Sequence, residues 1–484
     1  MSHFIAGEWE TGEGTPFSSF DPSTGELVWR GPAATSNEID HAIVAAQKAF
    51  PAWSLLSHTE RFSILKRFAE ILQKNEGVLA RQISLESGKP LWDAKGEIAG
   101  MIAKIDLTLQ AHHQRNDPFT KNNALTRFKP HGIIAVLGPF NFPGHLPNGQ
   151  IVPALLEGNV VIFKPSEFTP GVAELTVRYW VEAGIPSGVL QLLQGQKESG
   201  ELLTHHPKID GLFFTGSSTV GQKLIEHFAK TPEKILAVEM GGNNPLVVWE
   251  PCDPEAAVLG IILSAFTSAG QRCNAARRLI LPDNRWGDSL LERLIDQTKA
   301  LKVGSFRESP EPFIGSLISA KAAERALVSQ QNLITQGAKA LLAMRSLKTG
   351  TGLLTPGILE MPQNLAEDQE IFAPLLQVYR APTFEGALTL ANATRFGLAA
   401  ALFCDEKEKF TQFWSTIRAG VIHWNHPTNL ASGSAPFGGL GSSGNHRPAG
   451  YFMIDSCAYP VASMESPELQ KPTSLPPGIR SGNI

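Results

Sequence analysis

A cysteine, a glutamate and an asparagine have neighbours that suit chemistry at a carbonyl group. Cys273 lies in Ser-Ala-Gly-Gln-Arg-Cys, directly after an apolar stretch. A cysteine in such a place is commonly an inert core residue. Here Gly270 permits close backbone approach and Arg272 supplies positive charge, and both suit the thiolate, which is the reactive form. Cys273 is therefore a candidate nucleophile.

Glu239 is a candidate general base, because it ends an apolar run and precedes two glycines in AVEMGGNNP. A carboxylate that ends a buried strand is costly unless it is paired or used. The sequence leaves both a structural pairing and catalysis open. Asn141, in GPFNFPGHLPNG, is in the same way either a turn residue or an amide donor to an oxyanion.

Two other segments suit a nucleotide. The segment TGSSTVG follows the apolar run GLFF and opens a helix-like stretch, and the N-terminus of a helix favours a phosphate. Its residues after the threonine are Gly216, Ser217, Ser218, Thr219, Val220 and Gly221. The spacing is GxxxxG and not GxGxxG, so this motif alone is a weak signal. Lys164 and Glu167 follow the run NVVIF, where solvated loop charges and contacts to ribose hydroxyls both stay open.

The segments that would position these residues show two different patterns of apolar residues. Residues 37–85 carry apolar residues at i, i+3, i+4 and i+7, which predicts helices that end near Gly88 and Pro90. Residues 254–270 also predict a helix, and a buried one. From about 131 onwards, short apolar runs alternate with helix-like stretches, which predicts an α/β, doubly wound arrangement of parallel strands. The runs are IIAVLGP, NVVIFKP, GVLQLLQG, DGLFFTG, ILAVEMGG, PLVVWE, RRLILP and QVYRAP.

Composition bounds the class of protein. The chain has 484 residues, which predicts two or three domains at roughly 100–200 residues each. The net charge is -4 and no basic stripe is present, so we expect no nucleic-acid partner. No apolar stretch of about 18 residues predicts a membrane span, and the N-terminus does not resemble a secretion signal. Four dispersed cysteines without CxxC spacing predict no metal site and a reducing, cytoplasmic location.

The order of the motifs resembles the aldehyde dehydrogenase superfamily over essentially the whole chain. Matching segments are GPFNFP, KPSEFTP, FTGSSTVG, EMGGNNP, GQRC, EIFAPLL, ANATRFGLAA and PFGG. The resemblance implies a Rossmann-like NAD domain at 1–115 and 132–238 and an α/β catalytic domain at 239–440. It also implies a small β oligomerisation arm and tail at 116–131 and 441–484, and therefore a homodimer or homotetramer.

The resemblance also implies a role for each catalytic residue. Cys273 would attack a small-molecule aldehyde, and the Asn141 amide with the Cys273 backbone N–H would hold the oxyanion. Hydride transfer to a nicotinamide would leave a thioester, which a water activated by Glu239 would hydrolyse.

The cofactor contacts are implied in the same way. Glu370 resembles the residue that holds the nicotinamide ribose, with Phe372 beside it, and Lys164 and Glu167 would contact the adenine-side ribose. The carboxylate of Glu167 would repel a 2′-phosphate, so we expect NAD and not NADP.

Several polar groups near the nucleophile predict a substrate with carboxylates. These are His145, Arg272 and His426, whereas Arg277 and Arg278 are expected to be structural or to face the cofactor domain. Within the family, the wording of GPFNFPGHLPNG, EMGGNNP and SAGQRCNAARRL implies oxidation of N-succinyl-L-glutamate 5-semialdehyde to N-succinylglutamate, in the succinyl route of arginine catabolism.

Four alternatives stay open at this point. Succinate or glutamate semialdehyde would need a different substrate tunnel and the same catalytic residues. A CoA-acylating dehydrogenase would usually lack the base that Glu239 provides. A catalytically silent binding protein would not need Cys273, and a cysteine hydrolase would need a histidine base close to it.

Overall fold

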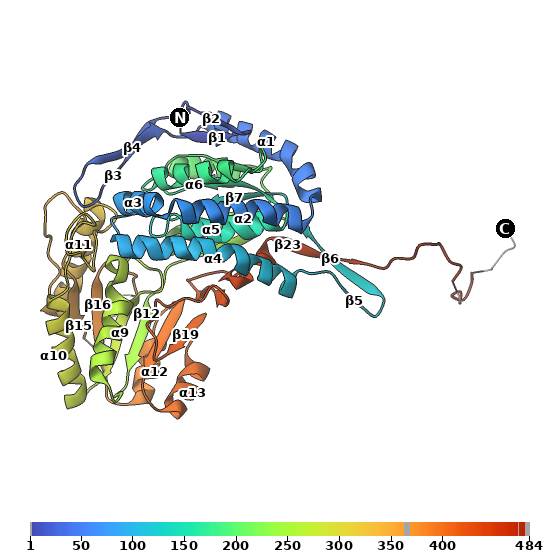
Figure 1. The fold of residues 1–484 in the computed structure, drawn as a ribbon. Coiled ribbons are helices and arrows are strands. Elements are labelled where there is room, and N and C mark those ends of the chain that lie inside the picture. The colour runs from blue at the N-terminus through green and yellow to red at the C-terminus, as the bar shows by residue number, and fades with distance from the viewer. Residues whose placement is uncertain (1, 363–367, 473, 480–484) are drawn as a thin grey trace.

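The computed structural model describes residues 2–362, 368–472 and 474–479. Parts of the predicted regions therefore lie outside the described residues, namely residue 1, residues 363–367 of the catalytic region, and residues 473 and 480–484 of the tail. Two seven-stranded sheets, each covered by helices, form the two large bodies of the molecule, one above the other in Figure 1. The predicted α/β fold is confirmed.

The first sheet has the strand order β11-β10-β7-β8-β9-β1-β2. Its five strands from β11 to β9 are parallel, and β1 and β2 add an antiparallel edge. Helices on both faces bury the parallel strands, which explains their continuous apolar runs. The strands are β1 His3–Ile5, β2 Glu8–Glu10, β7 Ile133–Leu137, β8 Val160–Lys164, β9 Leu190–Leu192, β10 Gly211–Thr215 and β11 Ile235–Glu239.

The helices predicted over 37–85 are present as three separate helices. Thr35 with Glu38, and Ser57 with Glu60, form capping boxes that begin the first two, and Gly88 in the left-handed conformation ends the third. The helices of this body are α1 Ser36–Leu55, α2 His58–Lys74, α3 Glu76–Ser87, α4 Leu91–Arg115, α5 His145–Leu156, α6 Pro170–Glu182, α7 Lys197–His205 and α8 Ser218–Phe228.

The second sheet has the order β14-β15-β16-β13-β12-β18-β19 and is parallel except for β14. Its strands are β12 Asn244–Val248, β13 Ala276–Pro282, β14 Lys339–Leu342, β15 Gly357–Glu360, β16 Leu375–Ala381, β18 Ala399–Phe403 and β19 Val421–Trp424. Its helices are α9 Pro254–Phe266, α10 Arg285–Lys299, α11 Ala320–Thr335, α12 Phe384–Asn392 and α13 Lys407–Thr416.

The prediction of one helix over 254–270 was wrong at its end. Helix α9 ends at Phe266, and a 3₁₀ turn, η1 Thr267–Gly270, follows it. Within this turn Ser268 and Ala269 both have a φ of 55°, which an α-helix cannot contain. The apolar composition of the segment gave no sign of this change of direction, because tertiary contacts of the turn impose it.

A third, smaller sheet projects from the side of the molecule in Figure 1, with the C-terminal segment extending beyond it. It has the order β23-β6-β5, with β5 Phe119–Lys121, β6 Ala124–Pro130 and β23 Ala458–Ser463. A 3₁₀ helix, η2 Tyr451–Ser456, directly precedes β23.

Three short ribbons complete the fold. They are β3 Pro16–Phe20 with β4 Leu27–Pro32, β17 Phe396–Gly397 with β21 Leu440–Gly441, and β20 Pro436–Phe437 with β22 Ala449–Gly450. Among the described residues, no helix combines the length and the apolarity that crossing a membrane requires.

Candidate active site

The predicted catalytic residues meet where the two large sheets face each other. Glu239 is the last residue of β11 in the first sheet, and Asn244 is the first residue of β12 in the second. The carboxyl edge of the first sheet therefore adjoins the amino edge of the second. Ligands of doubly wound folds bind at the carboxyl edge.

The loop that carries Cys273 is held in an unusual backbone conformation. Gly270 has a φ of +69°, and a Cβ there would collide with the carbonyl oxygen of Ala373, so only glycine fits. The Asn244 side chain donates to the carbonyl oxygens of Cys273 at 2.7 Å and Ala275 at 2.8 Å. Asn244 in turn accepts from the Ala399 N–H at 3.0 Å. These contacts hold the nucleophile loop against the second sheet.

Cys273 is partly exposed. Burial raises the pKa of the Cys273 thiol to about 12, and the nearby carboxylates Glu370 and Glu239 act in the same direction. Arg277 and the backbone N–H of Asn274 oppose this rise. Burial therefore works against the reactive thiolate, so Cys273 needs a base or a stabilising cation before it can react.

Glu239 is near enough to this thiol to act on its pKa, and only part of its hydrogen-bonding capacity is used. It is 7% exposed, and one carboxyl oxygen accepts from the Ala449 N–H at 3.2 Å. The other oxygen has no partner among the described residues. Burial raises the pKa of the Glu239 carboxyl well above its ordinary value. A carboxyl group with a raised pKa and a free oxygen next to a thiol is suited to accept a proton.

Two N–H donors lie next to the nucleophile. The side-chain amide of Asn141, in the loop after β7, donates one N–H to the Gln271 carbonyl oxygen at 3.0 Å. An amide NH₂ carries two donors, so the second N–H of Asn141 stays available. The backbone N–H of Cys273 has no acceptor among the residues that the structure describes. Together they supply the two donors that an oxyanion requires.

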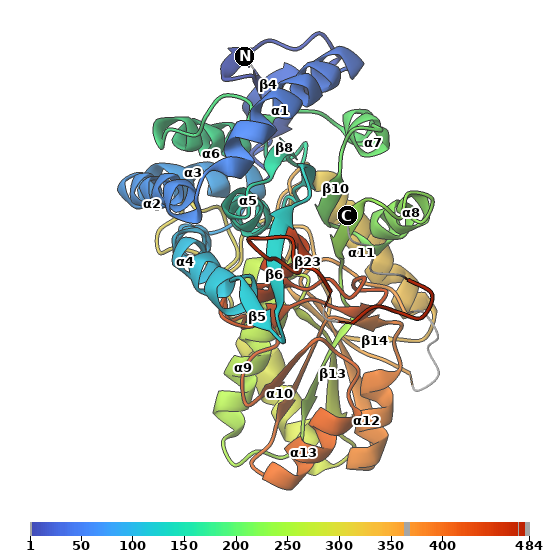
Figure 2. The same ribbon diagram turned by 90° about the vertical axis from the view of Figure 1, so that its right-hand side faces the viewer.

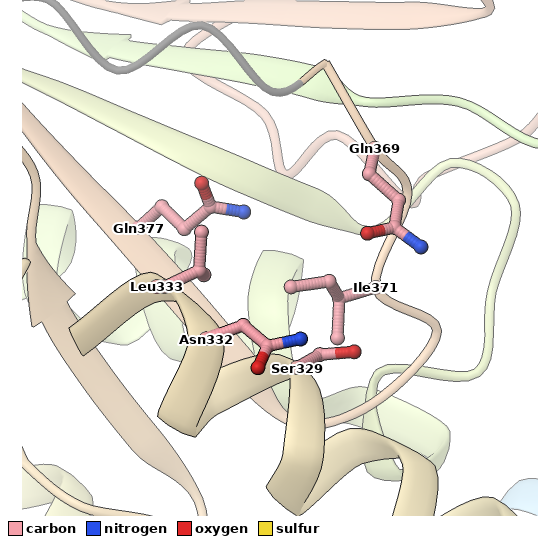
Figure 3. A pocket seen from close by; sticks show the side chains of 6 residues that line it. All are labelled: Ser329, Asn332, Leu333, Gln369, Ile371 and Gln377. Carbon is pink, nitrogen blue, oxygen red and sulfur yellow. The ribbon is translucent and has the colours of Figure 1, made fainter. Parts of the chain in front are cut away.

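Glu370 lies against the backbone of Gly241, where a Cβ would collide with its carboxylate. Its sequence neighbours Gln369 and Ile371 line a hollow formed with α11 (Figure 3). The Phe372 ring packs edge-on against Phe140, with centroids 5.9 Å apart.

The residues predicted to bind the adenine-side ribose lie at the end of β8. Lys164 is buried, and its Nζ donates to the Pro165 carbonyl oxygen at 2.8 Å. Burial lowers the pKa of Lys164 to about 8, although Glu167 and Glu198 act to raise it. Glu167 is half-buried beside it. A buried lysine with one backbone partner has two further N–H donors for hydroxyl groups.

The Gly-rich segment forms the predicted turn between β10 and α8. Ser217 is the N-cap of α8, and its hydroxyl accepts from the Val220 N–H at 3.4 Å. Ser217, Thr219 and Val220 are exposed, so the N-terminus of α8 is open to a phosphate. A Cβ at Gly221 would collide with the side chain of Met240, so this glycine serves close helix–strand packing.

His145 begins α5 and packs across α4. Its ring occupies the space that a side chain at Gly100 would fill, which explains a glycine in the middle of a long helix. The Nδ1 atom of His145 is buried without a partner among the described residues. Burial lowers the pKa of His145 to about 4, and the cations Lys104, Lys89 and Arg272 add to the effect. His145 is therefore a neutral group in positively charged surroundings.

Arg272 is engaged in an ion pair that links the nucleophile loop to α4. Its Nη2 donates to Asp93 at 2.7 Å and its Nε to the Ser268 hydroxyl at 2.9 Å. A second pair lies beside it, with Lys89 Nζ 2.7 Å from Glu97. His426, the third residue predicted to contact substrate, is exposed.

Four residues that the structure brings to this region were not predicted from the sequence as part of the site. They are Lys104, Asp93, Asn244 and Arg277. Lys104 is 6% exposed and donates to the Gly450 carbonyl oxygen, and no carboxylate in the described ranges lies within ion-pair distance of it. Charged residues on a largely buried helix were the available signal for Lys104 and Asp93.

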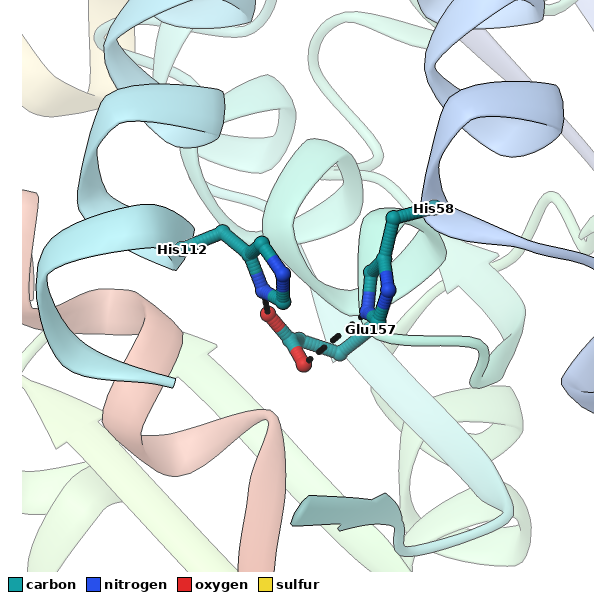
Figure 4. Close-up of side chains that lie close together, drawn as sticks. All are labelled: His58, His112 and Glu157. Atoms are coloured by element: carbon teal, nitrogen blue, oxygen red, sulfur yellow. Dashed lines mark hydrogen bonds and ion pairs between the residues drawn. The ribbon is translucent and has the colours of Figure 1, made fainter. Parts of the chain in front are cut away.

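A separate group of ionisable side chains joins the ends of three helices (Figure 4). His112 Nδ1 lies 2.7 Å from one oxygen of Glu157, and His58 Nε2 lies 3.8 Å from the other. The two rings stack with centroids 3.9 Å apart. The group contains none of the residues described above, and its short contact is an ordinary hydrogen bond. The expectation that the chain has no metal site stays a prediction.

Comparisons with known proteins agree with this geometry. A model of the aldehyde dehydrogenase family matches residues 9–460. Proteins named N-succinylglutamate 5-semialdehyde dehydrogenase are similar over 99% of both chains, at 52% identity in Ectopseudomonas mendocina (strain ymp) and 51% in Pseudomonas fluorescens (strain Pf0-1). The crystal structure of an NAD-dependent aldehyde dehydrogenase from Sinorhizobium meliloti superposes with a TM-score of 0.90 at 30% identity, covering 97% of this chain and 95% of that one.

Proposed function

The chain belongs to the aldehyde dehydrogenase family, and from that premise we propose that it oxidises N-succinyl-L-glutamate 5-semialdehyde to N-succinylglutamate with NAD as the hydride acceptor. Cys273 is the nucleophile, Glu239 is the general base, and Asn141 with the Cys273 backbone N–H holds the oxyanion. The arrangement of Cys273 beside a buried carboxyl group with a free oxygen carries this proposal.

The reaction begins with loss of the Cys273 thiol proton to solvent, which leaves Glu239 free for the later step. The sulfur then adds to the aldehyde carbon, and the carbonyl oxygen becomes an oxyanion that the two N–H donors stabilise. Loss of a hydride from that carbon leaves a thioester on Cys273. Glu239 next takes a proton from water as the water attacks the thioester, which releases the carboxylic acid and regenerates the sulfur nucleophile.

NAD, when bound, supplies the hydride acceptor. Residues at the carboxyl edge of the first sheet fit this group, because Lys164 has donors left for ribose hydroxyls and the N-terminus of α8 is open to a phosphate. The carboxylate of Glu370 has an oxygen without a hydrogen-bond partner among the described residues, which suits a hydroxyl donor. The half-buried carboxylate of Glu167 favours NAD over NADP, because it would repel a 2′-phosphate.

The substrate assignment rests on two observations. Relatives with that name match this chain over nearly its full length. The neighbourhood of α4 and α5 is also electropositive. It holds Lys89, Lys104 and Arg272 against Asp93 and Glu97, and the neutral His145 has an unpartnered ring nitrogen. A substrate that carries carboxylates gains most from such surroundings.

We also propose that the enzyme acts in the cytoplasm as a homodimer or homotetramer. The projecting sheet of β5, β6 and β23 supports an assembly, because β5 leaves one edge of that sheet uncovered within the chain. Sedimentation velocity on the purified chain distinguishes a dimer from a tetramer, and a monomer would contradict the assignment of this arm.

The test of function is a side-by-side comparison of aldehydes. NAD reduction is followed with N-succinylglutamate semialdehyde, succinate semialdehyde, glutamate semialdehyde and a simple alkanal, and kcat/KM is compared because that ratio discriminates substrates. We expect a clear preference for the succinylated substrate. A preference for another semialdehyde would overturn the substrate and leave the dehydrogenase, and NADH formation that requires CoA would overturn the hydrolytic step.

A further inference from the structure

Arg277, which the sequence predicted to be structural or to face the cofactor domain, connects the two segments that carry Cys273 and Glu370. It is 1% exposed, and its Nη1 donates to the Gly270 carbonyl oxygen at 2.5 Å and to the Ala373 carbonyl oxygen at 3.4 Å. Its Nη2 donates to the Arg272 carbonyl oxygen at 2.9 Å. One guanidinium therefore holds the loop just before the nucleophile and the segment just after Glu370.

A local irregularity of the sheet aims Arg277 at this place. Asn244 of β12 pairs with Ala276 of β13, and the next residue, Pro245, pairs with Arg278. Arg277 is therefore the extra residue of a β-bulge at the start of β13. Bulges redirect a side chain and are frequent next to active sites.

The same guanidinium faces the reacting groups. Its Nη2 lies 3.6 Å from Glu370 Oε1, beyond hydrogen-bond distance, and that oxygen and the Arg277 Nε have no hydrogen-bond partner among the described residues. The guanidinium also lies 5.2 Å from the centre of the Phe372 ring. Arg277 and Glu370 thus form a loose ion pair, in which the Arg277 Nε and the Glu370 Oε1 can each still take a hydrogen-bond partner.

The other charges around the Cys273 thiol explain why the charge of Arg277 matters. Glu239 from β11 and Glu370 from the segment before β16 place two carboxylates near Cys273. The other nearby arginine, Arg272, is committed to Asp93. Arg277 is the cation that acts on the Cys273 sulfur from within the site. Without it, the thiolate would face two carboxylates and no nearby opposing charge.

We propose that Arg277 is a positioning residue, which fixes the Cys273 loop against the Glu370 segment and supplies the cation that makes the Cys273 thiolate accessible. This inference rests on the proposed roles of Cys273 and Glu370. It predicts that loss of the charge at position 277 slows every reaction of the Cys273 sulfur, including reactions that need neither cofactor nor aldehyde.

The neighbouring Arg278 is a matched control. It is equally buried, and its guanidinium donates to the carbonyl oxygens of Asn243, Leu390 and Ala391, each at 2.8 Å. Its hydrogen bonds go to other segments than those of Arg277, and none of them involves Cys273 or Glu370. Replacing it removes as many backbone contacts without touching the charges at the thiol.

The experiment measures alkylation of the cofactor-free enzyme by iodoacetamide between pH 7 and 10. The peptides that contain Cys273 and the exposed Cys252 are quantified separately, so Cys252 serves as the reference thiol within each sample. We expect Arg277→Gln to slow alkylation of Cys273 on the order of tenfold at a given pH, which corresponds to a rise of about one unit in the thiol pKa. Arg278→Gln should lower the thermal unfolding temperature and leave the Cys273 rate within about twofold of the wild type.

Arg277→Lys separates charge from geometry, and it also serves if Arg277→Gln does not fold. A lysine keeps the positive charge but cannot reach three carbonyl oxygens in a planar fork. Its alkylation rate should lie closer to the wild type than that of Arg277→Gln, whereas its kcat with NAD and aldehyde should still fall. A Cys273 alkylation rate that is unchanged or faster in both Arg277 variants would overturn the proposal. Full turnover by Cys273→Ala would instead overturn the proposed function itself.

Discussion

Two buried groups of charges lie on either side of the nucleophile loop, and they are built in opposite ways. Along α4, Asp93 is bound by Arg272 and Ser268, and Glu97 is bound by Lys89 and by the backbone N–H groups of Gly144 and His145. On the other side, the carboxyl groups of Glu239 and Glu370 each retain an oxygen without a hydrogen-bond partner in the described part of the chain. The carboxylates of the first group are held by cations and N–H or O–H donors, whereas those of the second group keep oxygens without a partner.

The pKa shifts follow this difference. Burial would raise the pKa of Asp93, but Lys89, Arg272 and the Ser268 hydroxyl outweigh burial and lower it. Burial dominates at Glu239 and Glu370, and the pKa of each carboxyl group is raised. A buried carboxylate with all its hydrogen-bond partners stabilises the local structure, whereas one with a free oxygen can still accept a proton or bind a ligand. The contrast separates positioning residues from reacting ones.

The largest expected effect is loss of the sulfur. Cys273→Ala removes the only group that can form the thioester, so turnover should fall on the order of 10⁴-fold or more, because the steps it serves cannot proceed separately. NAD binding, measured by calorimetry, should persist. Cys252→Ala, at an exposed thiol, is the control and should keep wild-type activity.

The next effect is at the unsatisfied carboxyl group. Glu239→Gln keeps shape and burial but cannot accept the proton from water, so steady-state turnover should fall by roughly 10²–10⁴-fold. A rapid burst of NADH should remain in stopped-flow traces, since the hydride leaves before water attacks. Disappearance of the burst would mean that Glu239 acts earlier, on the Cys273 thiol.

A smaller effect is expected from breaking the satisfied group. Asp93→Asn leaves the Arg272 guanidinium without its anion and should lower the free energy of unfolding by about 3 kcal/mol, measured by urea denaturation. Asp106→Asn breaks the ion pair with Lys66, which is solvent-exposed, and should change stability too little to resolve. If both variants lowered the free energy of unfolding equally, the buried pair would contribute no more to stability than the exposed one.

The smallest effect is a difference in how stability depends on pH. The folded-state pKa of Asp93 is lowered, so its stabilisation is present above about pH 3.8 and is lost as the pH falls through the folded-state value. The folded-state pKa of Glu239 is raised, so its contribution is complete below about pH 4.5 and is lost as the pH rises through the folded-state value.

The thermal unfolding temperature of the cofactor-free protein, scanned at one fixed rate across pH 4 to 9, tests these signs. Glu239→Gln should be more stable than the wild type at pH 8 and should converge with it near pH 4.5. Asp93→Asn should be least stable relative to the wild type at pH 8. The reverse order at pH 8 would show that burial does not govern Glu239.

The sequence predicted the sheets well and the site contacts unevenly. Strands β7, β8, β10 and β11 read directly from continuous apolar runs, because burial on both faces leaves no polar alternation. The end of α9 was missed: Ser268 and Ala269 take positive φ values in a turn where Ser268 donates to Asp93 and Gly270 packs against Ala373, contacts that no local pattern encodes.

The partners of the buried charged residues could not be predicted from the sequence either. Arg272 was predicted to face substrate, and nothing near it in sequence indicates that Asp93, on a different helix, takes its guanidinium. Arg277 was predicted to be structural or to face the cofactor domain because a bulge cannot be read from an apolar strand. The identity of reacting residues is carried by local motifs, whereas the pairing of buried charges depends on contacts between distant segments.

Covalent catalysis by Cys273 is tested most directly by trapping the thioester intermediate. Glu239→Gln is mixed with N-succinylglutamate semialdehyde and NAD, quenched in acid within seconds, digested and analysed by mass spectrometry. We expect a thioester-linked acyl group on the peptide that contains Cys273, which adds the mass of the aldehyde less the two hydrogen atoms lost as hydride and proton, and little of it in the wild type. An adduct on Cys252, Cys404 or Cys457, or NADH formation with no adduct on Cys273, would contradict this role of Cys273.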